Sequence, residues 1–399
     1  GINPENVSGI VTELGGKTSH SAILARALEI PAVVAVNGLM DAVKDGDKVV
    51  LDGSTGEVFV DPEASVEKEY EEKRKQFLKD IGQPSVTKDG VQVEIVANIG
   101  KPEDVDKVLQ YDGEGVGLFR TEFLFMDRTA MPTEEEQFEA YKKVAIALNG
   151  KPVIIRTLDI GGDKEIPYMG LEKDENPFLG YRAIRLCLDR KEDIYKPQLR
   201  ALLRASAYGN IRIMIPLVTC IDELREAKAL IEEIKAELDE KNIAYKKDIQ
   251  VGIMVETAAA SLIADIFAKE ADFFSIGTND LTQYTMSVDR GNKKVSYLYS
   301  TFNPAVLRSI RHIIACGREA GIMVGMCGEA ASDPMMIPLL LAFGLNEFSM
   351  SASAILRARK MVTEYSVEEL QAVADKAMSF ATTAEVEDYM RKFVEKITG

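Results

Sequence analysis

The sequence predicts an α/β protein whose larger part is a (β/α)8 barrel of the TIM type, and three observations support this fold class. First, apolar and β-branched runs recur at 93–100, 115–122, 153–160, 211–218, 251–257, 273–278, 323–329 and 347–351. Second, stretches with helical periodicity lie between them. Third, polar residues gather just after these runs. Eight strand–helix alternations over ~250 residues or more are typical of the barrel. An open doubly wound sheet is the alternative, and the polar strand ends favour the barrel.

The residues before the barrel predict a second, smaller α/β domain. Residues 1–62 contain short apolar runs separated by glycine, a helix-like segment SHSAILARALEI, and two strands around a tight turn at 53–56. Residues 63–80 are mostly charged, with glutamates followed one turn later by basic residues, which predicts a solvated helix. We therefore expect a small domain at 1–62, a charged helical linker at 63–85 and the barrel at 86–399.

Composition excludes several functional classes. Acidic residues outnumber basic ones by 64 to 48, and the formal charge of −16 argues against a nucleic-acid or anionic-membrane binder. A small anionic substrate remains compatible, because a few arginines in one cleft can bind it. The four cysteines form no CxxC, so we expect no disulfide framework and a cytoplasmic location. The apolar runs are shorter than the ~20 residues of a membrane span. The chain opens with glycine and shows no signal peptide, so we expect it to be part of a longer protein.

Polar side chains lie at the carboxyl ends of several predicted strands. In a barrel these positions converge on one mouth, where the active sites of this fold lie. A single residue of this kind is usually a surface charge or a helix cap. Several that converge by register are more informative, and they are Arg120, Arg156, Glu256, Asn279, Asp280 and Cys327.

The types of these residues indicate the ligand. Two carboxylates on neighbouring strands, Glu256 and Asp280, suit Mg²⁺, which takes few protein ligands together with substrate oxygens. Arg182 and Arg290 add forked donors for a carboxylate or phosphate, and Lys164 adds a point charge beside a glycine-rich turn. Magnesium and an arginine cluster together predict a site for a phosphorylated carboxylic acid.

The sequence contains two histidines, and their settings differ. His312 lies in LRSIRHIIACGREA at helical spacing, and we interpret it as structural. His20 follows two glycines and two hydroxyl residues, directly before a predicted helix. Free N–H groups and the positive end of the dipole at a helix N-terminus stabilise a phosphate attached there. A neutral imidazole also offers a nucleophilic ring nitrogen, so His20 is a candidate phosphate carrier.

These segments resemble a known family. GGKTSHSAILARALEIPAVV is similar to the phosphohistidine segment of the phosphoenolpyruvate-utilising enzymes. The barrel segments GVGLFRTEFLFMDR, IIRTLDIGGDK, NPFLGYRAIR, MVET, SIGTNDLTQY, DRGN and GMCGE together resemble enzyme I of the bacterial sugar phosphotransferase system. The resemblance covers essentially the whole chain. It implies that residues 1–62 are part of a swivelling phosphohistidine domain, and that the barrel binds phosphoenolpyruvate and forms a homodimer.

The same resemblance implies a role for each candidate residue. His20 would accept the phosphoryl group on Nε2, and Cys327 would protonate the enolate to give pyruvate. Glu256 and Asp280 would hold Mg²⁺. The substrate contacts implied are Arg120, Arg156 and Arg290, with Asn279 and Asp280 at the phosphate and with Arg182 and Lys164 as further phosphate contacts.

The resemblance leaves two other functions open. One is a fragment of pyruvate phosphate dikinase or phosphoenolpyruvate synthase, although the sequence shows no ATP-grasp-like region. The other is a phosphoenolpyruvate-sensing module without turnover, which the complete set of candidate residues argues against. In enzyme I, a helical domain that docks the phosphocarrier HPr precedes this region, so we expect transfer to HPr to need that domain.

Overall fold

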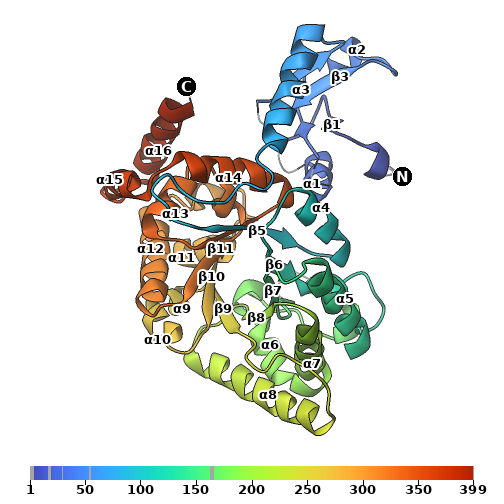
Figure 1. The fold of residues 1–399 in the computed structure, drawn as a ribbon, viewed down its shortest axis with the longest axis vertical. Coiled ribbons are helices and arrows are strands. Elements are labelled where there is room, and N and C mark those ends of the chain that lie inside the picture. The colour runs from blue at the N-terminus through green and yellow to red at the C-terminus, as the bar shows by residue number, and fades with distance from the viewer. Residues whose placement is uncertain (1–3, 17–18, 29, 54, 162–165, 399) are drawn as a thin grey trace. The chain divides into compact units, whose positions relative to one another are not determined.

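The computed structural model describes residues 4–16, 19–28, 30–53, 55–161 and 166–398, and it contains two compact units, Gly1–Gly82 and Gln83–Gly399 (Figure 1). The charged helix predicted at 63–80 is present as α3 (Ala64–Leu78) and belongs to the first unit. The boundaries expected at 62 and 85 thus stay predictions, with the contact boundary itself lying at 82/83.

The first unit is a small α/β structure with little buried apolar surface. Its strands β1 (Ile10–Val11) and β2 (Ala32–Val33) pair in parallel, and β3 (Val49–Asp52) pairs antiparallel with β4 (Glu57–Val60). The predicted helix and hairpin are therefore both present, with α1 at His20–Ala27 and a short α2 at Leu39–Ala42. Among its described side chains, the buried hydrophobic ones are Ala22, Ala25, Val33 and Leu39.

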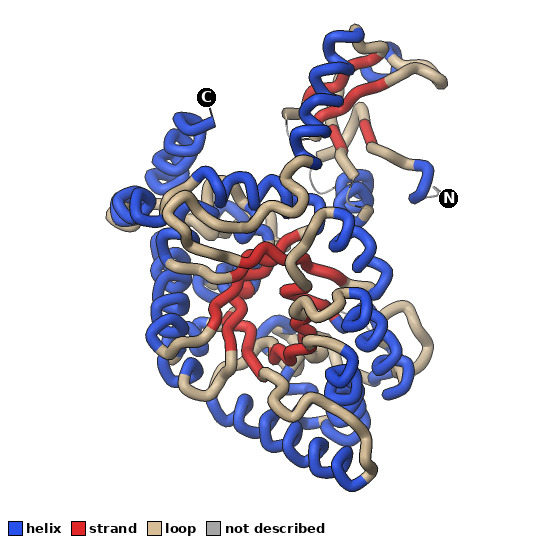
Figure 2. The backbone as a smooth tube through the Cα atoms, viewed as in Figure 1, coloured by secondary structure: helices blue, strands red, loops and turns tan. Residues whose placement is uncertain are grey.

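The second unit is a closed barrel of parallel strands, seen as the ring of red segments in Figure 2. Each strand lies within one of the eight runs predicted from the sequence, and the neighbours around the ring follow chain order. Closure confirms the barrel and excludes the open sheet. The strands are β5 (Glu94–Ile99), β6 (Val116–Arg120), β7 (Val153–Arg156), β8 (Ile211–Ile215), β9 (Val251–Val255), β10 (Phe273–Gly277), β11 (Met323–Cys327) and β12 (Glu347–Met350).

Helices surround this ring and bury its outer face. Their apolar sides and the outward-facing strand residues form one large core. Because helices cover the outside of each strand and the barrel interior covers its other face, the strand sequences are almost continuously apolar. The α-helices of this unit, of which α15 packs on α13 and α16 on α15, are α4 (Val105–Gln110), α5 (Glu134–Ala147), α6 (Ile184–Asp189), α7 (Lys196–Ala205), α8 (Ile221–Glu240), α9 (Ala258–Leu262), α10 (Ala264–Ala268), α11 (Thr278–Met286), α12 (Pro304–Glu319), α13 (Ile337–Phe343), α14 (Ile355–Glu364), α15 (Val367–Ala377) and α16 (Thr383–Thr398).

The inside of the barrel is a separate, smaller core. Leu118, Ile154, Met214, Met254 and Phe273 pack there, together with Cys327. Because side chains alternate along a strand, the residue two positions after an inward-facing one also faces inward. This periodicity brings polar residues at the strand ends onto the same inner surface.

Within the part of the chain that the structure describes, no helix has the length and apolar character needed to cross a membrane.

Candidate active site

A cavity of about 300 Å³ opens at the carboxyl ends of the barrel strands. Its lining includes all but one of the barrel residues predicted as functional from the sequence. They are Arg120, Arg156, Arg182, Glu256, Asn279, Asp280, Arg290 and Cys327. The remaining predicted barrel residue, Lys164, lies outside the described residues.

The strands themselves position four of these groups. Arg120, Arg156 and Cys327 are the last residues of β6, β7 and β11. Glu256 directly follows β9 and lies two residues after the inward-facing Met254. Strand register therefore carries these side chains to one end of the barrel, as the sequence predicted.

Helix α11 supplies the next two groups, because Asn279 and Asp280 lie in its first turn directly after β10. Two glycines make room there. A Cβ on Gly277 would come within 2.9 Å of Oε2 of Glu256, and a Cβ on Gly328 would come within 2.6 Å of the Thr278 hydroxyl. These glycines allow the carboxylates and the following helix to approach closely.

Two of the arginines at the mouth, Arg156 and Arg182, are held by carboxylates. Arg156 pairs with Glu122, and its Nη1 lies 3.5 Å from Oδ2 of Asp159. Arg182 donates from Nη2 to Oδ1 of Asp159 at 2.7 Å and lies 3.6 Å from Oδ2 of Asp280. Such paired and hydrogen-bonded guanidinium groups are fixed in orientation before any ligand binds.

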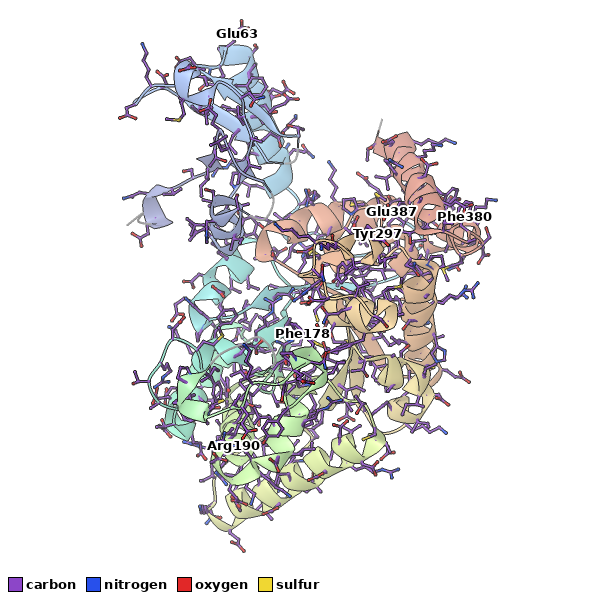
Figure 3. All side chains as sticks on the ribbon, turned by 180° about the vertical axis from the view of Figure 1, so that it is seen from behind. Glu63, Phe178, Arg190, Tyr297, Phe380 and Glu387 are labelled. Atoms are coloured by element: carbon purple, nitrogen blue, oxygen red, sulfur yellow. The ribbon has the colours of Figure 1, made fainter. Side chains whose placement is uncertain are left out.

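Two more contacts secure Arg182 against the rest of the mouth. Its Nη1 donates to the hydroxyl of Tyr284 at 3.2 Å, and that hydroxyl donates to the Phe178 carbonyl. Phe178, labelled in Figure 3, also contacts the guanidinium, whose carbon lies 5.6 Å from the ring centroid. Helix α11 and the segment before α6 thus meet at Arg182.

Arg120 and Arg156 make the site attractive to anions. Arg120 is partly buried, and this desolvation and the positive charge of Arg156 both lower its pKa. The pKa of Arg156 is raised, because the attraction of Glu122 and Asp159 outweighs the opposing effect of its burial. An anion bound between the two arginines would relieve the repulsion that acts on Arg120.

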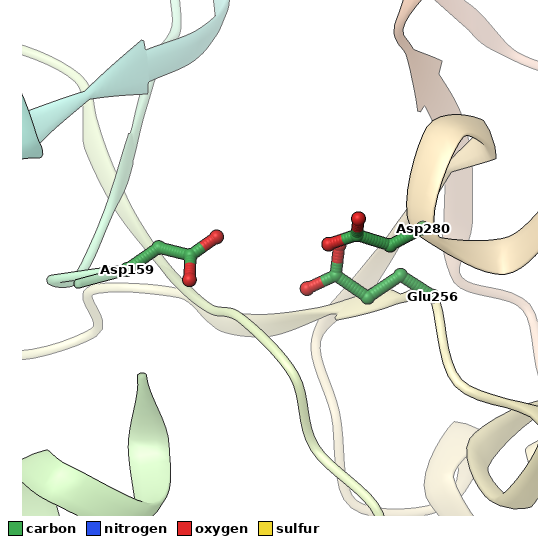
Figure 4. A group of neighbouring side chains, drawn as sticks. All are labelled: Asp159, Glu256 and Asp280. Carbon is green, nitrogen blue, oxygen red and sulfur yellow. The ribbon is translucent and has the colours of Figure 1, made fainter. Parts of the chain in front are cut away.

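Asp159, Glu256 and Asp280 form the one acidic group among the described residues whose ligand atoms all lie within 4.8 Å of one another (Figure 4). Burial of Glu256, together with the charges of Asp280 and Asp159, raises its pKa well above the usual value. Its Oε1 accepts the Leu217 N–H at 2.7 Å. Crowded carboxylate oxygens that resist ionisation suit a hard divalent cation, so the donor set fits such an ion.

Cys327 is buried at the floor of the cavity. Burial raises the pKa of its thiol, although a hydrogen bond from Ser275 and the charges of Arg156 and Arg120 oppose the shift. The Ser275 hydroxyl lies 3.6 Å from Sγ. At neutral pH this sulfur therefore carries a proton that it can donate.

His20 lies in the other unit and is the first residue of α1. Its side chain is exposed. The preceding residue, Ser19, accepts the Ala22 N–H on its hydroxyl at 3.3 Å, so it caps this helix. The predicted position of His20 at a helix N-terminus is therefore present.

Sequence reasoning missed Glu122 and Asp159. Both stand two or three residues after a predicted arginine, in RTE and RTLD, where an acidic residue looks like an ordinary helix cap or turn. The available signal was their spacing, because each follows the strand end that carries an arginine of the cavity.

Two family descriptions match the chain. The PEP-binding domain of PEP-utilising enzymes matches residues 74–367, and the mobile domain of the same enzymes matches residues 1–56. The chain thus has the two parts of a phosphoenolpyruvate-utilising enzyme. The first is a small unit that contains His20, and the second is a barrel whose mouth is lined by carboxylates and arginines.

Curated relatives narrow this class. The chain is 53% identical to the phosphoenolpyruvate-protein phosphotransferase of Staphylococcus carnosus, over 99% of its own length and 70% of that protein. It is 52% identical to the one from Bacillus subtilis and 51% identical to the one from Priestia megaterium, over 98% of the chain in both cases and over 70% and 69% of those proteins. The chain therefore belongs to the phosphoenolpyruvate-protein phosphotransferase family.

Among solved structures, an HpcH/HpaI aldolase/citrate lyase family protein from Burkholderia cenocepacia aligns with a TM-score of 0.42 and 15% identity, over 71% of this chain and 96% of that one.

Proposed function

We propose that this enzyme transfers the phosphoryl group of phosphoenolpyruvate to His20 and releases pyruvate, as the first step of the sugar phosphotransferase system. The observation that carries the proposal is the single cavity in which arginines, a carboxylate group suited to a cation and a protonated thiol converge. The names of the relatives and the family matches support the choice of substrate.

The arginines provide binding energy for a substrate that has two anionic groups, a carboxylate and a phosphate. Arg120, Arg156 and Arg290 would bind its carboxylate and phosphate, with Arg182 and Lys164 as further phosphate contacts. The Asn279 side chain offers an amide to the phosphate oxygens. Because Arg156 and Arg182 are buried, charge-assisted hydrogen bonds from these two arginines are stronger than they would be in water.

Glu256 and Asp280 would hold Mg²⁺, with Asp159 beside them. The bound cation would neutralise charge on the phosphate oxygens. The crowding of these carboxylates and the raised pKa of Glu256 support the proposal, because both are relieved by a cation.

The reaction balances with the residues of the chain. Nε2 of His20 attacks phosphorus, the bond between phosphorus and the enol oxygen breaks, and the enolate of pyruvate is left in the cavity. Cys327 then donates its proton to the methylene carbon, which gives pyruvate and a thiolate that solvent reprotonates. His20 must reach the cavity for this step, which is consistent with its place in a unit of its own.

Partners follow from the same assignment. We propose that phosphorylated His20 passes its phosphoryl group to HPr, that the barrel forms a homodimer and that the protein acts in the cytoplasm. The formal charge of −16 supports a basic surface on the partner and gives no support to nucleic-acid binding or to attachment to an anionic membrane.

A pyruvate burst tests this function. The chain is mixed with phosphoenolpyruvate and Mg²⁺ in the absence of HPr, and pyruvate is counted. We expect one pyruvate per chain from the wild type and none from His20→Ala, which should still bind phosphoenolpyruvate. Continuous release without an acceptor, or an equal burst from His20→Ala, would exclude His20 as the acceptor.

A further inference from the structure

Asp159 lies between the arginines of the cavity and its other two clustered carboxylates. It follows β7 by three residues, and its side chain is buried. Its Oδ1 accepts a hydrogen bond from Arg182 at 2.7 Å, and its Oδ2 lies 3.5 Å from Nη1 of Arg156. One carboxylate thus holds two arginines that come from different segments of the barrel mouth.

The same carboxylate belongs to the acidic group suited to a cation. In Figure 4, Asp159 faces Glu256 and Asp280 across a gap, and each of the three has a ligand atom within 4.8 Å of the others. Its position therefore allows Asp159 to interact either with the arginines or with a cation, and a cation would compete for its charge.

Asp159 contacts donor atoms of two arginines that, in the proposed function, bind the substrate anion. Nη2 of Arg156 pairs with Glu122, and Nη1 of Arg182 donates to Tyr284. The other Nη atom of each arginine faces Asp159. The Nε atoms of both arginines are buried without a hydrogen-bond partner among the described residues. Each guanidinium group therefore has at least one N–H donor that makes no hydrogen bond within the described residues.

We propose that Asp159 couples cation binding to substrate binding by controlling Arg156 and Arg182. Without a cation, its negative charge holds the two guanidinium groups. Engagement of its carboxylate by a cation weakens that hold and leaves the donors to the anionic groups of the substrate. Asp159 acts through the arginines, so it is a positioning residue. This inference rests on the proposed function, which makes phosphoenolpyruvate the ligand of the cavity.

The coupling is measured as a ratio of affinities. In a His20→Ala background, which prevents turnover, calorimetry gives the dissociation constant of phosphoenolpyruvate with and without Mg²⁺. We expect Asp159→Asn to reduce this ratio by ~10-fold or more, because coupling between two sites typically changes an affinity by ~5–150-fold. Asp159→Glu, which keeps the charge, should retain most of the coupling. Asp193→Asn is the matched control, because Asp193 pairs with Arg190 on the surface.

A second measurement needs no substrate. Arg182→Gln removes one competitor for the Asp159 charge, so Mg²⁺ alone should bind this variant more tightly than it binds the wild type. This readout remains available if Asp159→Asn does not fold.

Failure of the proposed function and failure of the inference about Asp159 would give different results. If the His20→Ala chain does not bind phosphoenolpyruvate under any condition, the proposed function is wrong. If it binds, and Asp159→Asn keeps the wild-type ratio or Arg182→Gln leaves the Mg²⁺ affinity unchanged, Asp159 is only a structural partner of the arginines and the inference is overturned.

Discussion

The role proposed for Cys327 depends on its place at the end of β11. The same thiol elsewhere in the chain is inert in this respect. Cys187 is buried among apolar groups, and Cys220 is exposed beside Glu223. At Cys327, burial keeps the proton on sulfur while two arginines nearby favour the thiolate that remains after donation. These opposing influences suit a general acid.

Replacement of Cys327 tests this role. We expect Cys327→Ala to slow pyruvate formation by ~10²-fold or more, the usual contribution of general acid catalysis, while the affinity for phosphoenolpyruvate changes little. Rapid-quench assays of pyruvate and calorimetry of binding measure the two quantities. Cys220→Ala is the control. A Cys327→Ala chain that forms pyruvate at the wild-type rate would assign the proton to another group.

Arg156 is the arginine whose replacement is most informative, because it has buried carboxylates on two sides. Arg156→Lys keeps the charge and loses the forked donors, so the affinity for phosphoenolpyruvate should fall by ~10-fold or more, the cost of about one charged hydrogen bond. Titration calorimetry measures this change. Arg190→Lys, on the surface, should leave binding unaltered, and an equal effect of the two substitutions would contradict the assignment.

At the scale of elements, the strands were predictable and their ends were not. Every predicted run contains a strand, because parallel strands buried on both faces are apolar throughout. Several runs extend beyond the strand that they contain. The run at 115–122 continues into Thr121 and Glu122, where the backbone turns into a short 3-10 helix. Local sequence does not encode such a turn, because tertiary contacts of the side chains determine where the strand ends.

The residues of the candidate site were likewise predictable only in part. Arginines, Asn279 and Cys327 were found because polar residues at strand ends stand out from apolar runs. Asp159 and Glu122 were missed, because their importance lies in contacts with Arg156 and Arg182 across the mouth. Pairing between segments this far apart in the chain has no signature in a single sequence.

The opposite end of the barrel contains a second cluster of charged groups, around the buried Glu347. Register places Glu347, the first residue of β12, beside Glu94 of β5, and Arg212 on β8 also acts on both carboxyl groups. Both oxygens of Glu347 are buried without a hydrogen-bond partner among the described residues. Burial and the charge of Glu94 raise the pKa of Glu347 to about 8, against the opposing effect of Arg212.

This cluster makes barrel stability depend on pH. Because the folded pKa of Glu347 is above its unfolded value, the folded state retains a proton, and stability should fall as pH rises from the unfolded pKa of 4.5 to about 8. We expect Glu347→Gln to remove much of this fall and to be the more stable protein at pH 9, by on the order of a few kcal/mol. Urea unfolding between pH 5 and pH 9 measures it, with the exposed Glu319→Gln as control. Parallel pH profiles for wild type and Glu347→Gln would contradict the account.

At the scale of the whole molecule, the two units differ in how much core they have. The barrel unit buries a large apolar core, whereas the first unit buries four small or medium hydrophobic side chains among those described. Stability scales with the apolar area removed from water, so the first unit should be the less stable part. This difference is consistent with the proposed function, in which the first unit delivers His20 to the cavity.

A separated barrel tests this division of labour. Residues 83–399 produced alone should fold and bind phosphoenolpyruvate with the affinity of the His20→Ala chain, and should form no pyruvate, because the acceptor is missing. Circular dichroism, calorimetry and a pyruvate assay measure these properties. Loss of binding in a folded barrel would mean that the first unit completes the substrate site.

The most direct test of the central claim is the intact mass of the chain after incubation with phosphoenolpyruvate and Mg²⁺. The account predicts that the wild type gains one phosphoryl group that is lost in acid, as expected for a phosphohistidine, and that His20→Ala gains none. An acid-stable phosphate, or the same gain in mass on His20→Ala, would contradict it.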